Sequence, residues 1–286
     1  MLVRQEEARV RNDYVWKACA SIAAAIAFVA PHAAVAQEQA GEGNWDLIRQ
    51  SMFAGRTIEE DGARLVELET PVRAEDAAVV PIAIRTRMPQ DPSKYVKKVY
   101  LVIDRNPSPV GAIFTFTPDS GRADIETRVR IEEYTNVRAI AETSDGRLFM
   151  TTNYVKASGG CSAPAGKDLA ESMARMGKMK FRVEGDVKQG EPALAQLMIS
   201  HPNLSGMAMD QMTRLFTPAH FVRKIDVSYG GKPVMSAEVD FTISENPNVR
   251  FYFVPRGPGE LKAEVVDSNQ LKFESSIQVK PGTAGS

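Results

Sequence analysis

Cys161 is the residue of this chain whose type and surroundings best suit covalent chemistry. It lies in a segment, residues 157–166, with the sequence ASGGCSAPAG. Small residues of this kind are typical of a flexible loop and leave the sulfur sterically open. The sequence therefore predicts a mobile arm that displays a thiol to other proteins. The residues of this carrier arm around the cysteine are Ser158, Gly159, Gly160 and Ser162.

The reactivity of this thiol depends on its thiolate fraction, which is small at neutral pH for a free cysteine with a pKa near 8.5. A helix that begins two or three residues after Cys161 would favour the thiolate through its dipole, as would the charges of Lys156 and Lys167. We therefore expect an accessible thiol with a lowered pKa. The alternative is a small buried apolar residue, the commonest fate of a free cysteine.

Residues 1–36 predict a secretory signal peptide that is cleaved after Ala36. A basic stretch precedes the apolar run 18–30, and the small-residue triplet Ala34-Val35-Ala36 follows it. The run has 13 residues, whereas an uncleaved membrane anchor, the rival interpretation, needs about 20. Cleavage removes Cys19, so an exported, periplasmic protein keeps Cys161 as its one thiol. An unpaired cysteine in an oxidising compartment indicates a reactive or intermolecular role.

Charge and histidine content exclude two classes of function. The chain has 35 basic and 36 acidic residues without a long basic block, so a nucleic-acid partner is not expected. There is no Gly-x-Ser-x-Gly motif, and residues 37–286 hold two histidines, His201 and His220, which gives a serine-hydrolase triad little support. We expect both histidines to be hydrogen-bonding residues of the fold, with no catalytic role.

Copper binding is a further alternative. Met207, Met209 and Met212 follow His201 and could join Cys161 around Cu(I), which accepts thioether and thiolate ligands. Methionine also fills gaps in cores and interfaces. We therefore expect packing residues here and no metal site.

Hydrophobic periodicity predicts an all-β protein. Residues 123–132 alternate apolar and polar side chains, the pattern of a half-buried strand with one wet face. Similar short runs recur between turn residues, which favours antiparallel sandwiches over the alternative of one large barrel. Asp145-Gly146 and Gly230-Gly231 indicate tight hairpins. The other expected strands are 65–70, 79–87, 96–103, 111–117, 137–142, 148–155, 179–183, 221–229, 233–244, 249–254, 261–267 and 271–279.

Two helices are expected beside the strands. One begins with Asn44 as its N-cap, packs Trp45 on a sheet and stops at Gly55. The other begins at Ala163 or Pro164 and ends before Gly177. The expected organisation is a signal peptide at 1–36, a sandwich at 37–156, the cysteine loop and linker helix at 157–177, and a second sandwich at 178–286.

Several motifs resemble the SoxY and SoxZ sulfur-carrier proteins, in particular fused SoxYZ-like carriers associated with quinoprotein dehydrogenases. The first half resembles SoxY at Trp45, at residues 71–82 (PVRAEDAAVVPI) and at Gly159-Gly160-Cys161. The second half resembles SoxZ at residues 201–206 (HPNLSG), 218–221 (PAHF) and 243–247 (ISENP).

The resemblance implies two immunoglobulin-like sandwiches and a non-enzymatic carrier that holds sulfur intermediates on Cys161. Its implied partners are periplasmic sulfur-oxidation enzymes, or a quinoprotein dehydrogenase and its cytochrome, and no cofactor is implied beyond a covalent sulfur adduct. The alternative function is a non-catalytic binding accessory of a quinoprotein alcohol dehydrogenase, with copper delivery less favoured. One departure stands out: SoxY ends in a Gly-Gly-Cys-Gly-Gly tail, whereas here Ser162 and Ala163 follow Cys161 and the chain continues.

Overall fold

The computed structural model describes residues 35–164, 169–210 and 213–282, and the signal-peptide prediction therefore lies almost entirely outside the described residues. The first half holds α1 (Val35–Phe53), β1 (Ile58–Glu59), β2 (Val66–Glu69), β3 (Val80–Thr86), β4 (Val96–Ile103), β5 (Val110–Phe116), β6 (Ile125–Val129), β7 (Thr135–Thr143) and β8 (Leu148–Val155). The second half holds α2 (Leu169–Arg175), β9 (Met179–Glu184), β10 (Ala193–Ile199), β11 (Val222–Tyr229), β12 (Lys232–Val239), β13 (Asn248–Phe253), β14 (Gly259–Asp267) and β15 (Lys272–Val279).

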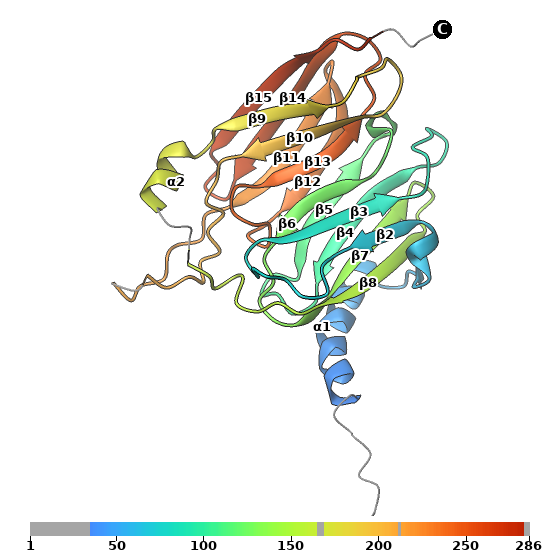
Figure 1. The fold of residues 1–286 in the computed structure, drawn as a ribbon. Coiled ribbons are helices and arrows are strands. Elements are labelled where there is room, and N and C mark those ends of the chain that lie inside the picture. The colour runs from blue at the N-terminus through green and yellow to red at the C-terminus, as the bar shows by residue number, and fades with distance from the viewer. Residues whose placement is uncertain (1–34, 165–168, 211–212, 283–286) are drawn as a thin grey trace, which may run out of the picture.

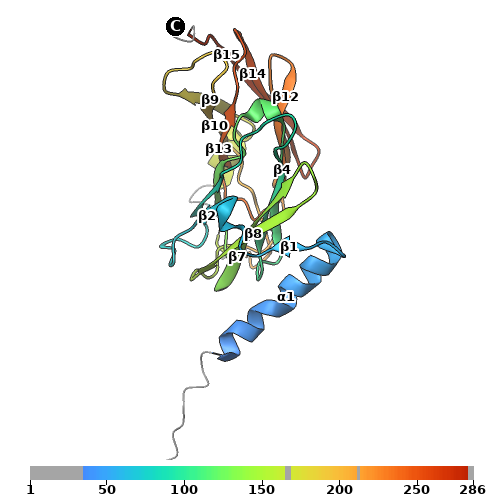
Figure 2. The ribbon, with the colours of Figure 1, turned by 90° about the vertical axis from the view of Figure 1, so that its right-hand side faces the viewer.

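The strands of the described residues form two facing sheets (Figures 1 and 2). One has nine strands in the order β1-β8-β7-β4-β5-β12-β11-β14-β15, and the other has six in the order β2-β3-β6-β13-β10-β9. All pairings except the short β1–β8 pair are antiparallel. The all-β, sandwich-type architecture expected from the alternating pattern is confirmed.

Both sheets continue from the first half into the second. β5 pairs with β12 over five positions, from Ala112 opposite Val239 to Phe116 opposite Met235. β6 pairs with β13 at Glu126 and Arg250, and a bridge joins Val129 to Ile243. The two expected sandwiches therefore share their sheets edge to edge, in addition to the covalent link through residues 157–177.

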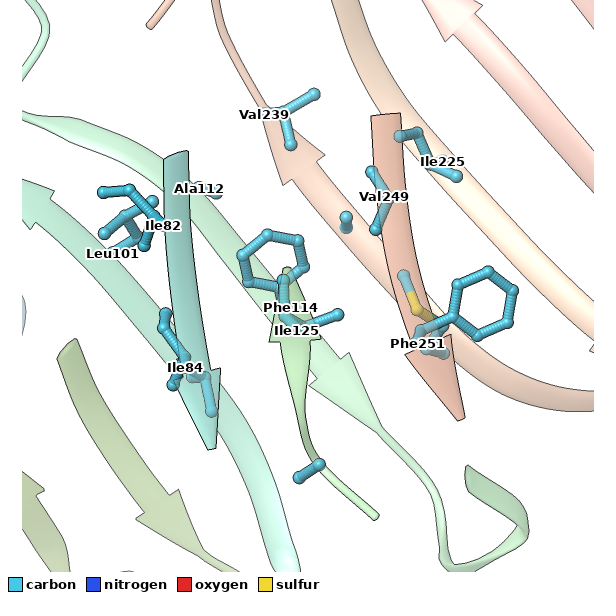
Figure 3. Close-up of a cluster of buried hydrophobic side chains, with 14 of the residues drawn as sticks. Ile82, Ile84, Leu101, Ala112, Phe114, Ile125, Ile225, Val239, Val249 and Phe251 are labelled. Carbon is cyan, nitrogen blue, oxygen red and sulfur yellow. The ribbon is translucent and has the colours of Figure 1, made fainter. Parts of the chain in front are cut away.

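The core lies between the sheets and runs through this junction. Figure 3 shows Ile82, Ile84 and Ile125 of the six-stranded sheet near Leu101 and Phe114 of the nine-stranded sheet. Val249, Phe251 and Ile225 continue the same buried layer into the second half. Full burial of each large side chain contributes about 1.5–3 kcal/mol, so a continuous core ties the halves together.

β6 keeps the alternation that its sequence predicts, with buried and partly exposed side chains in turn, and only the residues that flank it depart from the pattern. Its inward side chains, Ile125 and Val129, are buried as expected. On the other face Asp124 and Arg130, which flank the strand, are also buried. Both flanking residues have polar partners: an Asp124 carboxylate oxygen accepts from the Thr86 amide at 2.8 Å, and Arg130 donates to the carbonyls of Phe241 and Ile243.

The C-terminal part of α1 packs on the outer face of the nine-stranded sheet, and in Figure 2 the rest of the helix projects away from the two sheets. Trp45, Ile48 and Phe53 pack on side chains of β4, β7 and β8, as expected for Trp45. The guanidinium of Arg138 stacks on the Trp45 ring at 4.5 Å and pairs with the buried carboxylate of Asp104 at 2.8 Å. Among the described residues no helix is long and apolar enough to cross a membrane.

Three details of the predicted elements were wrong. Asn44 is not an N-cap, because α1 begins at Val35, and its side-chain amide instead donates to the carbonyl of Asp104 at 2.8 Å. α2 begins at Leu169, and neither Ala163 nor Pro164 is helical. β10 was not expected, because its small residues Ala193 and Ala195 weaken the alternating signal.

The turn predictions were right. β7 and β8 pair as an antiparallel hairpin through Asp145-Gly146, and Gly146 has φ 84°. β11 and β12 pair through Gly230-Gly231, whose φ values of 54° and 78° suit a mirror-image turn. Gly177 follows α2 with φ 83°, as expected of a helix C-cap glycine.

The shared sheets predict that the halves are stable only together. Expressed as two pieces, 37–164 and 169–286, the chain should copurify as a one-to-one complex by size-exclusion chromatography. Each piece alone should aggregate, because separation exposes four strand edges, those of β5, β6, β12 and β13. Two soluble pieces that do not associate would contradict the shared-sheet arrangement.

Candidate functional site

The segment that carries Cys161 is fastened to the end of β6. It leaves β8 and passes the chain that follows β6, where the amide of Gly159 donates to the Glu132 carbonyl at 2.8 Å. The amide of Gly160 donates to the Ile131 carbonyl at 2.9 Å. In Figure 1 this yellow-green stretch between β8 and α2 runs on the same side of the molecule as the stretch that leads from β10 to β11.

Glu132 makes the densest set of contacts to this segment. Among the described residues its carboxylate accepts three hydrogen bonds: from the Cys161 amide at 2.8 Å, the Ser162 amide at 3.1 Å and the Ser162 hydroxyl at 2.8 Å. Hydrogen bonds to a charged acceptor are stronger than neutral ones. The carboxylate therefore fixes the backbone on both sides of the Cys161 side chain.

Gly160 is required by close packing of the backbone. A Cβ at this position would lie 2.0 Å from the carbonyl oxygen of Ala77 and 2.8 Å from the amide nitrogen of Ile131. Gly159, with φ 82°, supplies the turn before it. In this conformation the small residues of Ser158–Ser162 let the backbone pack closely against its neighbours, and the mobility of the arm stays a prediction.

The Cys161 side chain is buried, with 1% of its surface exposed, and it is unpaired. Burial raises the pKa of its thiol to about 12, helped by the charges of Glu132 and Asp240 and opposed by Arg130. The expectation of an accessible thiol with a lowered pKa was therefore wrong. The described part of α2 begins at Leu169, and Lys167 lies outside the described residues.

Arg130 links the cysteine site to the second half. One of its guanidinium nitrogens, Nη1, donates to the carbonyls of Phe241 and Ile243, each at 2.9 Å, and its amide donates to the Thr242 carbonyl at 2.7 Å. Burial lowers the pKa of this guanidinium. Its positive charge acts to lower the pKa of Cys161, against the effects of burial and of Glu132.

Ser205 adds a contact from the stretch that follows β10. Its hydroxyl donates to the Cys161 carbonyl at 2.6 Å and accepts from the Met207 amide at 3.1 Å. The sulfur therefore lies at the junction of the two halves. Sequence reasoning missed Arg130, Glu132, Asp240 and Ser205, because nothing in their local patterns shows that they surround the cysteine.

The two histidines, predicted to be hydrogen-bonding residues of the fold, lie together in the second half with Asp267. The Nε2 of His220 is 2.8 Å from the Asp267 carboxylate, and the Nε2 of His201 is 3.6 Å from the same oxygen. All three side chains are buried. The prediction that each histidine serves the hydrogen bonding of the fold is confirmed, although their proximity was not foreseen.

The protonation of this cluster follows from its contacts. The backbone amide of Asn203 donates to His201 Nδ1 at 3.0 Å. The neutral ring therefore carries its proton on Nε2, which faces Asp267. Burial and the nearby His220 lower the pKa of His201 to about 4. Burial acts to raise the pKa of Asp267, but hydrogen bonds from His220 and two backbone amides outweigh it and the pKa is lowered.

These contacts argue against a metal at the cluster. The three ligand atoms lie within 4.8 Å of one another, close enough to surround an ion. A metal on His201 Nε2 would displace its proton to Nδ1, where the Asn203 amide already donates. His201 Nε2 is buried without a hydrogen-bond partner, 3.6 Å from the Asp267 carboxylate, so what disfavours a metal here is the tautomer that Asn203 imposes on His201.

The methionines considered for copper binding differ in their exposure to solvent. Met209 is exposed and forms a β-bridge with Phe216. Met207 is half-buried, and Met212 lies outside the described residues. The Met207 amide and the Cys161 carbonyl share the Ser205 hydroxyl as a hydrogen-bond partner, and neither contact involves the thioether or the thiol that copper would require.

Comparisons with known proteins agree with the two halves. Residues 49–161 match the family of the sulfur oxidation protein SoxY, and the match ends at Cys161. Residues 180–278 match the family of the sulphur oxidation protein SoxZ. None of the curated proteins is similar enough to the chain to count as a match.

Two solved structures resemble part of the chain. The sulfur carrier protein SoxY from Chlorobium limicola f thiosulfatophilum is 23% identical, with a TM-score of 0.35, over 42% of this chain and 98% of that chain. A superoxide reductase (neelaredoxin) from Ignicoccus hospitalis is 19% identical, with a TM-score of 0.28, over 41% of this chain and 90% of that one.

The raised pKa of Cys161 predicts slow alkylation of the folded protein. A pKa of about 12 instead of 9.0 lowers the thiolate fraction at pH 8 about 1000-fold. Iodoacetamide should therefore label Cys161 of the native protein at least about 100-fold more slowly than Cys161 of protein in urea, with a rate that keeps rising above pH 9. Equal rates for folded and unfolded protein would show that the thiol is exposed.

The lowered pKa of His201 predicts a loss of stability in acid. The unfolded ring takes up a proton near pH 6.5, whereas the folded ring does so only near pH 4. The free energy of unfolding should therefore fall by about 3 kcal/mol as the pH drops across this window. His201→Asn keeps an acceptor for the Asn203 amide but has no titrating ring. Urea titrations should show a shallower pH dependence for this variant, and an unchanged slope would assign the effect to other groups.

Proposed function

Because the chain belongs to the SoxY/SoxZ family of sulfur oxidation proteins, with one domain of each kind in a single chain, we propose that it carries sulfur intermediates covalently on Cys161. The observation that carries this proposal is the place of the cysteine. Cys161 is the last residue of the SoxY match and lies where the SoxY-like and SoxZ-like halves meet. In this function the protein turns over no substrate by itself and serves partner enzymes.

The chemistry of such a carrier is exchange at sulfur. The Cys161 thiolate attacks the outer sulfur of a partner's persulfide, the S–S bond of the partner breaks, and the partner thiolate leaves. One S–S bond forms as one breaks, so no external oxidant or reductant is needed. The proton of the Cys161 thiol passes to solvent or to the departing thiolate.

The buried position of Cys161 suits the resting state of this carrier. A thiol with a pKa of about 12 is protonated at neutral pH and reacts poorly with oxidants and stray electrophiles. The exposed residues Ser158, Ser162 and Pro164 lie on either side of it, so the sulfur is close below the surface. Exchange therefore requires that this short segment move outward when a partner docks.

Exposed apolar side chains on the stretch between β10 and β11 support partner binding. Leu215 and Phe216 are 69% and 61% exposed, and Met209 bridges to Phe216. They belong to the same stretch between β10 and β11 as Ser205, which holds the Cys161 carbonyl. Exposed apolar side chains grouped in this way are typical of protein interaction sites.

The proposed setting is the periplasm, with sulfur-oxidation enzymes as partners. The support is the predicted signal peptide, whose removal after Ala36 would make Gln37 the first residue. A mature chain with Cys161 as its single thiol has no intrachain disulfide available in that oxidising compartment.

A second candidate is a non-catalytic binding accessory, for instance of a quinoprotein alcohol dehydrogenase. The burial and raised pKa of Cys161 favour it, because in that function the thiol is a packing residue. The two candidates differ in their need for sulfur chemistry at position 161.

Cys161→Ser separates them. Serine keeps the size of the side chain and removes the nucleophile, so the variant should fold with a melting temperature within about 2 °C of the parent, a shift that corresponds to roughly 1 kcal/mol for a chain of this size. In the native host it should lower the oxidation rate of reduced sulfur compounds at least about tenfold. Full activity of the folded variant would reject the carrier and favour the accessory.

A further inference from the structure

The resting position of Cys161 depends on few contacts. Its backbone is held by Glu132 on one side and by Ser205 on the other. Ser162, the next residue, is exposed and is bonded to the same Glu132 carboxylate through both its amide and its hydroxyl. Three of the polar contacts that hold the segment therefore converge on one side chain, the Glu132 carboxylate.

Glu132 is itself placed on a rigid base. Its amide donates to the Asn106 side-chain oxygen at 3.0 Å, and the Asn106 side-chain nitrogen donates to the Arg130 carbonyl at 2.8 Å. Its carbonyl accepts from the Gly159 amide. The carboxylate is thus presented to the segment by the end of β6 and keeps its place when the segment moves.

The charge of Glu132 acts on the sulfur as well as on the backbone. After burial, the negative charge of Glu132 is the largest cause of the raised pKa of Cys161, because it disfavours the thiolate. The same residue therefore holds the segment closed and keeps the thiol protonated while it is closed. Outward movement of residues 158–164 removes both effects in one step.

We propose that Glu132 is a latch, a positioning residue that keeps Cys161 sheltered and unreactive until its three hydrogen bonds are broken. The inference rests on the proposed function in that a carrier must open to exchange sulfur, but the latch itself is defined by the contacts alone. Because the chain is continuous on both sides of Cys161, opening is a local movement of this segment, and Glu132 sets how often it occurs.

The test is the rate at which iodoacetamide alkylates Cys161 in the full-length protein, measured from pH 7 to 11 by peptide mapping, which separates Cys161 from Cys19. Glu132→Gln removes the charge and weakens the hydrogen bonds, and should raise the rate at pH 8 about ten- to hundredfold. Ser162→Ala removes one of the three bonds and should raise it by about three- to tenfold. Both variants should shift the pH profile of the alkylation rate toward that of urea-unfolded protein. An unchanged melting temperature would show that this shift does not come from a general loss of packing.

The matched control is Glu133→Gln. Glu133 is the exposed neighbour that pairs with Arg105 at 3.4 Å, so its neutralisation changes the net charge equally without touching the segment. It should leave the rate within about twofold of the parent. Equal acceleration by Glu133→Gln, or no acceleration by Glu132→Gln, would overturn the latch. If Glu132→Gln does not fold, Ser162→Ala decides alone.

The outcome also separates the latch from the carrier. Fast labelling of Glu132→Gln together with a fully active Cys161→Ser would keep the latch and reject the carrier. Unchanged labelling of Glu132→Gln together with an inactive Cys161→Ser would keep the carrier and reject the latch.

Discussion

The pairing of strands across the two halves is the constraint on which the cysteine site depends. β5 with β12, and β6 with β13, bring the end of β6 against residues 240–243 of the second half. Arg130 then bonds to that second-half segment, while Glu132, two residues further on, bonds to the cysteine segment. Without the shared sheets the chemistry-bearing residues would belong to separate domains with no fixed geometry between them. The fold therefore turns a tandem of two sandwiches into a single frame around one sulfur.

This frame shields the thiol more completely than the composition of its segment suggests. Glycine and serine allow mobility in a free chain, but they also allow backbone to approach backbone, and Gly160 lies against Ala77 and Ile131 in a space that admits no Cβ. A buried thiol beside carboxylates is protonated and inert, whereas a thiol on a moving segment is accessible. A carrier needs both properties at different times, and a segment held by a few polar contacts supplies them at low energetic cost.

Much of the fold follows from the sequence because its cause is local. Alternation placed β4 and β8 with their observed bounds, and paired glycines or Asp-Gly placed two hairpins. β10 was not predicted, because alanine occurs both in cores and on surfaces and so weakens the alternating pattern. In the site, Cys161 could be singled out by its neighbours, but its burial could not, since Glu132, Arg130 and Ser205 are distant in sequence and ordinary in context. The cluster of His201, His220 and Asp267 could not be predicted either, because tertiary packing brings these residues together from distant parts of the sequence.

The central claim, that Cys161 bears sulfur intermediates, is tested most directly by intact mass spectrometry and peptide mapping of protein isolated from its native host. The account predicts a population with added mass at Cys161 that corresponds to one or more sulfur atoms, or to a sulfur oxyanion group, and sulfane sulfur in it should be removed by a thiol reductant. Protein from actively oxidising cells that carries only the unmodified thiol at Cys161 would contradict the account and leave the cysteine as a packing residue at the junction of the two halves.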